Sequence, residues 1–130
     1  MIIDLETLRD IAEIEFGDIV QDVMISDINE MRIIFTDNSF LDVWYSLKLS
    51  GRYSYHWERR HIDNKIYRHD NAPHFKWKNV RTFPKHFHCE DENRVIESRI
   101  SNDPFEALRE ILFFVQSEML RIKSKPKNRS

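Results

Sequence analysis

Residues 40–60, FLDVWYSLKLSGRYSYHWERR, contain two stretches in which apolar and polar residues alternate, and these stretches decide the fold. A period of two is typical of β-strands that are buried on one face. Ser50-Gly51 between the stretches is a turn signal. The sequence therefore predicts consecutive strands over residues 40–49 and 52–60. The apolar positions on one face of each are Leu41, Val43, Tyr45, Leu47 and Leu49, then Tyr53, Tyr55 and Trp57.

Shorter segments on both sides of this pair extend the predicted sheet. Residues 19–25 and 31–35 are rich in β-branched and other apolar residues, which favours strands. Residues 65–69 follow Asp63-Asn64, a second turn signal, and are expected to return as a fifth strand. Residues 94–98 are a candidate for one more short strand.

Two helices are predicted near the ends of the chain. Asp4 is a suitable N-cap for the first, and Gly17 ends it. Asp103, Pro104 and Glu106 give the second an N-cap, a proline at the first helical position and a capping glutamate. An apolar stripe in that helix indicates packing against a partner layer. The stripe consists of Phe105, Leu108, Leu112, Val115, Met119 and Ile122.

The order of these elements predicts an α+β fold. We expect an antiparallel meander of about five strands with the N- and C-terminal helices packed on one face. Residues 1–122 would form a single domain, and residues 123–130 a basic flexible tail. The opposite face of the sheet, rich in polar and histidine side chains, is then left for function.

The composition is that of an ordinary globular protein. The chain has 130 residues, of which 41% are hydrophobic and 32% charged, enough for one domain with a modest core. Apolar runs are too short for a transmembrane helix, and the N-terminus lacks the pattern of a signal peptide. Cys89 is the single cysteine, which excludes an internal disulfide framework. We therefore expect a cytoplasmic protein.

The net charge of −2 conceals strong segregation along the chain. Residues 1–51 have a net charge of −8 and residues 89–120 of −5, whereas residues 52–88 have a net charge of +6 and contain all six histidines. The last ten residues add five basic side chains and no acidic one. Such segregation favours an anionic ligand for the central block and the tail.

Residues 66–88 contain the candidate active-site residues. Beyond Asp70 this segment has neither a helical nor a strand period, but Pro73 and Pro84 stiffen it. Its many apolar residues exclude a solvated linker, so we predict an ordered functional loop. An extended segment at His86-Phe87-His88 would place both imidazoles on one side. Whether Arg68 and Asp70 share a face with His56 and Glu58 depends on the strand register.

These residue types suit the cleavage of a phosphodiester. That reaction needs a general base, a general acid and a cation that stabilises the phosphorane. We assign proton transfer first to His74 and His86, with His88 as a further candidate, and phosphate binding to Arg68 and Lys85. Asp70 is expected to orient Arg68 or a histidine. Residues expected to bind the substrate, single-stranded RNA whose bases stack on aromatic rings, are His56, Arg59, Lys76, Trp77 and Lys78.

Two other functions fit the same residues. His74, His86 and His88 could supply three nitrogen ligands to zinc, which would make the protein a zinc-dependent hydrolase. The basic, aromatic block could instead bind nucleic acid or an acidic protein without catalysis. In that case, charge reversals at Arg59, Arg60, Lys76 and Lys78 would matter more than any single histidine. The leading interpretation needs no cofactor and no metal.

The segment also carries a family resemblance. Arg68-x-Asp70-Asn71-Ala72-Pro73-His74, followed by Phe83-Pro84-Lys85-His86-Phe87-His88, resembles the signature of the TumE-type toxin family of prokaryotic type II toxin–antitoxin systems. The order of helices and strands agrees over nearly the whole domain. The resemblance implies a growth-inhibiting toxin encoded beside an antitoxin that binds and silences it, and ribonuclease activity is an inference from that role.

One position departs from the resemblance. Members of the family commonly have a second histidine after the one that matches His74, whereas this chain has Phe75. If both histidines are catalytic in relatives, this protein would be impaired or would use His86 or His88 instead. If the second histidine is structural, Phe75 changes little. The expected partners are a cognate antitoxin protein and an RNA substrate, with a homodimer left open and no membrane partner.

Overall fold

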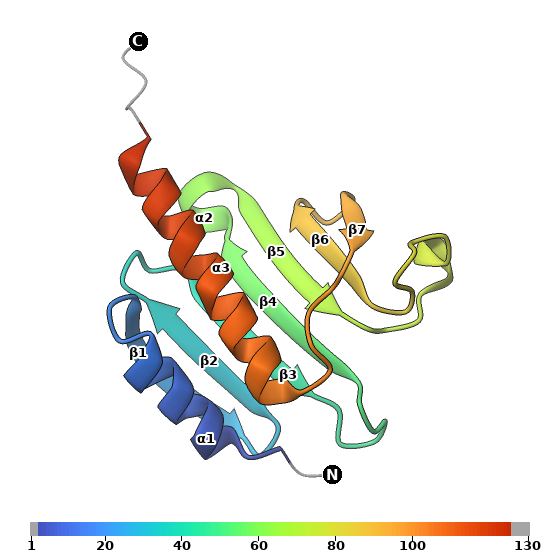
Figure 1. The fold of residues 1–130 in the computed structure, drawn as a ribbon, viewed down its shortest axis with the longest axis horizontal. Coiled ribbons are helices and arrows are strands. Elements are labelled where there is room, and N and C mark those ends of the chain that lie inside the picture. The colour runs from blue at the N-terminus through green and yellow to red at the C-terminus, as the bar shows by residue number, and fades with distance from the viewer. Residues whose placement is uncertain (1–2, 126–130) are drawn as a thin grey trace.

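The computed structural model describes residues 3–125, which form an α+β fold (Figure 1). The described chain contains seven strands: β1 (Val20–Asp27), β2 (Glu30–Phe35), β3 (Phe40–Tyr45), β4 (Tyr53–Arg59), β5 (Lys65–Asp70), β6 (His86–Glu90) and β7 (Val95–Glu97). Its helical segments are α1 (Leu5–Asp10), the π-helix η1 (Ile11–Glu15), α2 (Arg60–Asp63), the 3₁₀ turn η2 (Phe75–Trp77) and α3 (Pro104–Ser124).

The strands form one sheet in the order β1-β2-β3-β4-β5-β6-β7, and each pairs antiparallel with the next along the chain. The predicted meander is therefore confirmed, but the expected count of about five strands is too low. β6 begins inside the segment that we interpreted as an irregular loop and continues to Glu90. β7 lies inside the candidate strand at residues 94–98. The irregular loop is consequently confined to residues 71–85.

One face of the sheet carries the hydrophobic core. Cross-strand neighbours such as Leu41 and Trp57 point to this face, and buried residues of both terminal helices join them in a single cluster. α3 crosses the sheet diagonally, and α1 lies near β1 (Figure 1). The helix residues in the core are Leu5, Leu8, Ile11, Ala12, Ala107, Leu108, Ile111, Leu112 and Val115. Both terminal helices therefore cover one face, and the other face is left to polar side chains.

Some predicted boundaries are wrong for local reasons. β3 ends at Tyr45, and Leu47 and Leu49 are 58% and 53% exposed. The Ser46 hydroxyl accepts hydrogen bonds from the backbone N–H groups of Lys48 and Leu49, which turns the chain out of the sheet. α3 continues to Ser124, so residues 123 and 124 of the predicted tail belong to the helix. The rest of that predicted tail, residues 126–130, lies outside the described residues.

None of the helices formed by residues 3–125 has the length and apolar composition that a membrane span requires.

Candidate active site on the polar face of the sheet

The polar face brings together titratable side chains from three neighbouring strands. The register pairs His56 of β4 with Arg68 of β5, and Arg68 with His88 of β6. Two residues further along the strands, and therefore on the same face, Asp70 of β5 pairs with His86 of β6. Because side chains of paired residues lie on the same face, these five form one cluster. The register that the sequence left open therefore places Arg68 opposite His56, and Asp70 lies on the same face opposite Ser54.

Arg68 lies at the centre of this cluster. Its Nη1 and Nη2 atoms donate hydrogen bonds of 2.9 and 2.7 Å to the two carboxylate oxygens of Glu92, in the turn between β6 and β7. Its Nε atom donates to Asp70 at 3.1 Å. The same Nη atoms lie 3.4 Å from His56 Nδ1 and 3.2 Å from His88 Nε2. The guanidinium therefore has a carboxylate on one side and an imidazole at each end.

The hydrogen bonds of His88 fix its tautomer. Its Nδ1 atom lies 2.7 Å from the backbone carbonyl of Glu92, which can only accept, so Nδ1 carries the proton. Nε2 is then free to accept from Arg68. Burial and the Arg68 charge lower the pKa of His88 below its ordinary value. His88 is thus a neutral imidazole whose basic nitrogen faces the guanidinium.

His86, unlike His88, is protonated on both ring nitrogens. Its Nδ1 atom lies 2.9 Å from the Pro84 carbonyl and its Nε2 atom 3.1 Å from Asp70 Oδ1, so both nitrogens donate. Burial lowers the pKa of His86, but these two bonds outweigh it and raise that pKa above its ordinary value. Burial likewise opposes the charge on Asp70, yet hydrogen bonds from His86, Ala72 and Arg68 lower the pKa of the carboxyl. His86 and Asp70 therefore form a buried ion pair.

His56 is held by a second carboxylate. Its Nε2 atom lies 3.1 Å from Glu58 Oε1, and Arg60 donates several hydrogen bonds to the same carboxylate. The bonds from Arg60 lower the pKa of Glu58 to about 2. Glu58 consequently stays ionised at neutral pH and orients the imidazole toward Arg68.

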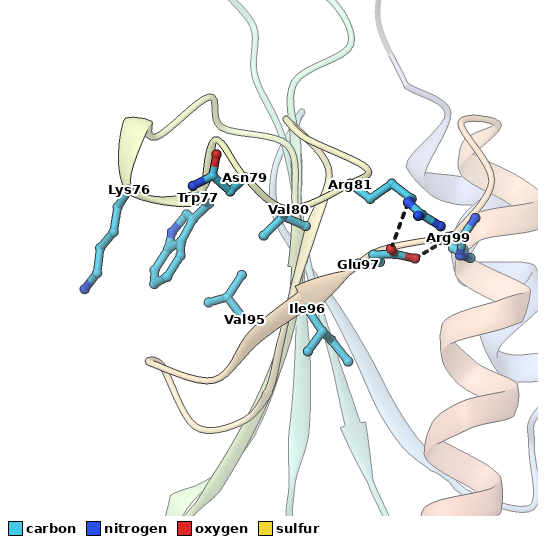
Figure 2. Close-up of a pocket in the computed structure, with 9 residues that line it drawn as sticks. All are labelled: Lys76, Trp77, Asn79, Val80, Arg81, Val95, Ile96, Glu97 and Arg99. Carbon is cyan, nitrogen blue, oxygen red and sulfur yellow. Dashed lines mark hydrogen bonds and ion pairs between the residues drawn. The ribbon is translucent and has the colours of Figure 1, made fainter.

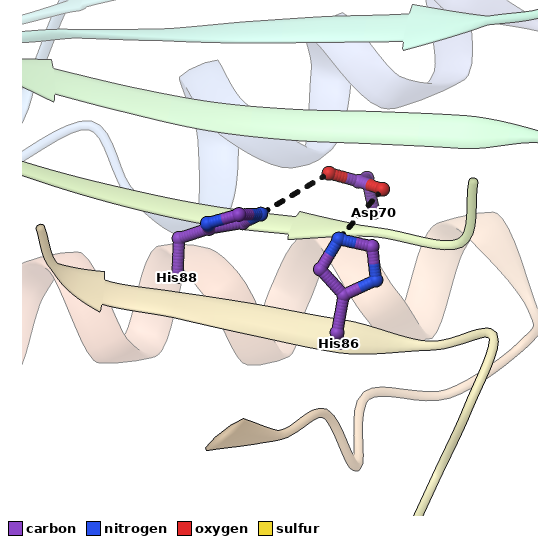
Figure 3. Close-up of side chains that lie close together, drawn as sticks. All are labelled: Asp70, His86 and His88. Carbon is purple, nitrogen blue, oxygen red and sulfur yellow. Dashed lines mark ion pairs between the residues drawn. The ribbon is translucent and has the colours of Figure 1, made fainter. Parts of the chain in front are cut away.

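Asp70, His86 and His88 are also a candidate metal site (Figure 3). One ligand atom from each lies within 4.8 Å of the other two. The alternative zinc site grouped His74 with His86 and His88, but here Asp70 takes the place of His74. Arg68 already donates to Asp70 and to His88 Nε2, so a cation at this point would meet a guanidinium within hydrogen-bonding distance.

Three of the predicted residues lie outside the cluster. His74 is exposed, and its Nδ1 accepts a hydrogen bond from the Lys76 N–H at the start of η2. The Lys85 ammonium donates to the carbonyl of Ile100, on the side opposite His86. Arg59, expected to bind substrate, is 1% exposed, because it lies on the core face between Asp37 and Asp63.

The predicted substrate-binding residues of the loop lie at the border of the cluster. The Trp77 ring lies 5.8 Å from the His88 ring and 6.3 Å from the His86 ring, measured between centroids. The ammonium of Lys76 lies over Trp77, and that of Lys78 over the exposed ring of Phe75. The loop therefore adds an aromatic wall and positive charge beside the two histidines.

Sequence reasoning missed Glu92 altogether. Glu92 belongs to the acidic run Glu90-Asp91-Glu92, which resembles an ordinary solvated turn in sequence. Only the pairing of β5 with β6 brings this turn over Arg68. The charge of Arg68 was a signal that an acidic partner exists, but no spacing rule identifies which one.

The fold and this cluster define a small α+β protein with a histidine-rich site, centred on Arg68, on the polar face of a meander sheet. The profile of the family described as Toxin TumE matches residues 5–119. The chain therefore belongs to the TumE toxin family, which confirms the resemblance and supports a toxin role. Neither curated proteins nor solved structures gave a match.

Proposed function

We propose that this protein is the toxin of a toxin–antitoxin pair and cleaves RNA by general acid–base catalysis without a resident metal. The observation that carries the proposal is the placement of His56 and His88 at opposite ends of the Arg68 guanidinium. A phosphate bound to Arg68 in the position of the Glu92 carboxylate would lie between two imidazoles. This is the arrangement that in-line displacement at phosphorus requires.

The residues then divide the reaction as follows. His88 Nε2 takes the proton from the ribose 2′-hydroxyl, and the 2′-oxygen forms a bond to phosphorus. His56 donates a proton to the 5′-oxygen as the bond from phosphorus to that oxygen breaks. Arg68 stabilises the charge on the phosphorane. The products are a 2′,3′-cyclic phosphate and a 5′-hydroxyl. His88 then releases to water the proton that it gained, and His56 takes one up from water, which restores both histidines.

Asp70 and His86 act as positioning residues in this mechanism. Asp70 holds the Nε atom of Arg68, and His86 fixes Asp70 from the other side. Both nitrogens of His86 are already engaged with protein partners as donors, whereas His88 Nε2 carries no proton and faces Arg68. This geometry moves proton transfer from His74 and His86, our first assignment, to His56 and His88.

The test is cleavage of unmodified RNA by purified protein in EDTA, with mass spectrometry of the product ends. We expect cleavage by the wild type, and a loss of about 10²- to 10⁴-fold in His88→Ala and His56→Ala. His61→Ala, a change at an exposed histidine outside the cluster, is the control and should leave the rate unchanged. His74→Ala distinguishes the two assignments, because only the sequence-based one makes it inactive.

A second candidate function rests on the grouping of Asp70, His86 and His88. In this case the protein would be a zinc-dependent hydrolase. Cleavage abolished by EDTA and restored by Zn²⁺, with about one zinc per chain in the purified protein, would favour it. RNA binding without cleavage under any of these conditions would instead favour a non-catalytic module. Growth of a bacterial host is then measured after induction of the wild type and the same variants. This shows whether the activity found in vitro accounts for toxicity.

A further inference from the structure

A groove runs beside the candidate active site, between the loop and the edge strand β7 (Figure 2). Its apolar floor is formed by Trp77, Val80 and Val95. The volume is about 990 Å³, at the upper end of the ~300–1,000 Å³ typical of pockets for small ligands. An open groove of this size suits an extended segment of a polymer better than one small molecule.

Positive charge lines the rim of the groove. Lys76, Arg81 and Arg99 contribute cations, and Glu97 is the one acidic residue among the lining residues. The side chains of Arg81 and Arg99 are 82% and 68% exposed and both contact Glu97 (Figure 2). Because one carboxylate faces two guanidinium groups, the rim keeps an excess of positive charge. Its complement is a polyanion.

The groove and the catalytic cluster share a wall. Trp77 lines the groove and also lies against His86 and His88. Val95, on the floor, is the cross-strand partner of His88. A chain bound at Arg68 of β5 would reach the groove at β7 by passing over β6, beside Trp77.

We propose that this groove binds the single-stranded RNA that flanks the scissile phosphate, with Arg81 and Arg99 contacting successive backbone phosphates and a base stacking on Trp77. The inference rests on the proposed function and extends it by a second contact region for the substrate. Proteins that bind single-stranded nucleic acid combine aromatic side chains, on which bases stack, with cationic side chains that contact the phosphates. The bound segment is unpaired, because a duplex hides its base faces.

The experiment measures binding separately from cleavage. The full chain is titrated into fluorescent 2′-O-methyl RNA, which lacks the 2′-hydroxyl nucleophile, and anisotropy gives Kd over a range of salt concentrations. Arg81→Ala/Arg99→Ala is the test variant. Arg109→Ala/Arg121→Ala is the matched control, since both of these arginines also pair with glutamates but lie on α3.

We expect the test variant to bind a 12-nucleotide strand at least about fivefold more weakly and the control to bind like the wild type. The slope of log K against log salt should flatten by about 1.4, because two phosphate contacts are lost. Trp77→Leu should also weaken binding, and Trp77→Phe should weaken it less because a ring remains for stacking.

Several results would contradict the proposal that the groove binds RNA. These are equal binding by the test variant and the wild type, equal weakening in test and control variants, or no binding of RNA by the wild type. An antitoxin complex that is broken by Arg81→Ala/Arg99→Ala while RNA binding persists would assign the groove to a protein. The proposed ribonuclease activity is tested separately. If binding depends on the groove but unmodified RNA is not cleaved, the catalytic proposal is rejected and the RNA-binding role of the groove stands.

Discussion

At the residue scale, Glu92 occupies the position at Arg68 where the substrate phosphate is expected. Its carboxylate accepts two hydrogen bonds from the guanidinium, the bidentate arrangement that arginine also offers to phosphate. The Glu92 side chain is 45% exposed and lies on a turn, so it can move away. Substrate binding would thus exchange one anion for another, and Glu92 keeps Arg68 oriented until then.

We expect Glu92→Gln to bind 2′-O-methyl RNA about fivefold more tightly than the wild type. The reason is that a neutral amide bonds to a guanidinium about 1 kcal/mol more weakly than a carboxylate does, so it competes less with phosphate. Fluorescence anisotropy gives the two dissociation constants. Glu90→Gln is the control, because it makes the same charge change near Lys65 and Arg94 and away from Arg68. A tighter complex in both variants would reflect net charge alone and would contradict competition by Glu92.

At the scale of elements, those with a strong local pattern could be predicted from the sequence. The Asp103 carboxylate accepts a hydrogen bond from the Glu106 N–H at 3.0 Å, as the capping signal at the start of α3 indicated. Alternation in β3 and β4 placed Leu41 opposite Trp57 on the core face. In both cases the information lies within a few residues, since caps and strand periods are local properties.

β6 could not be predicted in the same way. Its sequence, His86-Phe87-His88-Cys89-Glu90, does alternate, but the face it presents to the polar cluster consists of histidines rather than apolar residues. His86 and His88 are buried because Asp70 and Arg68 satisfy their nitrogens across the strand pair. These partners lie 16 and 20 residues away along the chain, and only the register reveals them. The sequence therefore indicated which residues belong to the cluster but not how they are arranged in space.

The packing of α3 on the sheet gives a prediction at the same scale. Leu112 is fully buried in the core, so Leu112→Ala should lower the free energy of unfolding by about 2–5 kcal/mol. Leu120→Ala on the same helix removes an exposed side chain and should change it by less than about 0.5 kcal/mol. Urea denaturation followed by circular dichroism measures both. A Leu112→Ala protein as stable as the Leu120→Ala protein would argue against the observed face of α3.

At the scale of the whole molecule, His86 on the polar face and His69 on the helix face make the stability depend on pH with opposite signs. On the polar face, the pKa of His86 is raised, so the stability it contributes is present at pH values below 6.5 and is lost as pH rises through its folded pKa. On the helix face, His69 stacks on Phe87 at 4.1 Å and lies 2.7 Å from the Ser98 hydroxyl. Burial and the nearby charge of Lys85 lower its pKa from 6.5 to about 3.

The sign for His69 follows from the protons bound in each state. Between pH 6.5 and about 3 the unfolded chain carries a proton on His69 that the folded chain excludes, so the folded state loses stability as pH falls through this range. From pH 7.5 to 5 this one group should remove about 2 kcal/mol from the free energy of unfolding. His88, whose pKa is also lowered, acts in the same direction, and His86 opposes both.

Replacing His69 isolates its contribution to the pH dependence of stability, because the wild type and the variant share all the other histidines. We expect His69→Asn to be less stable than the wild type at pH 7.5, owing to the lost stacking on Phe87, but to lose about 2 kcal/mol less on going to pH 5. Urea midpoints at several pH values measure the difference. His61→Asn, which changes an exposed histidine, should keep the slope of the wild type. Parallel stability curves for wild type and His69→Asn would mean that His69 titrates alike in the folded and unfolded chain, and that the packing of Phe87 and Ser98 against it does not exclude the proton.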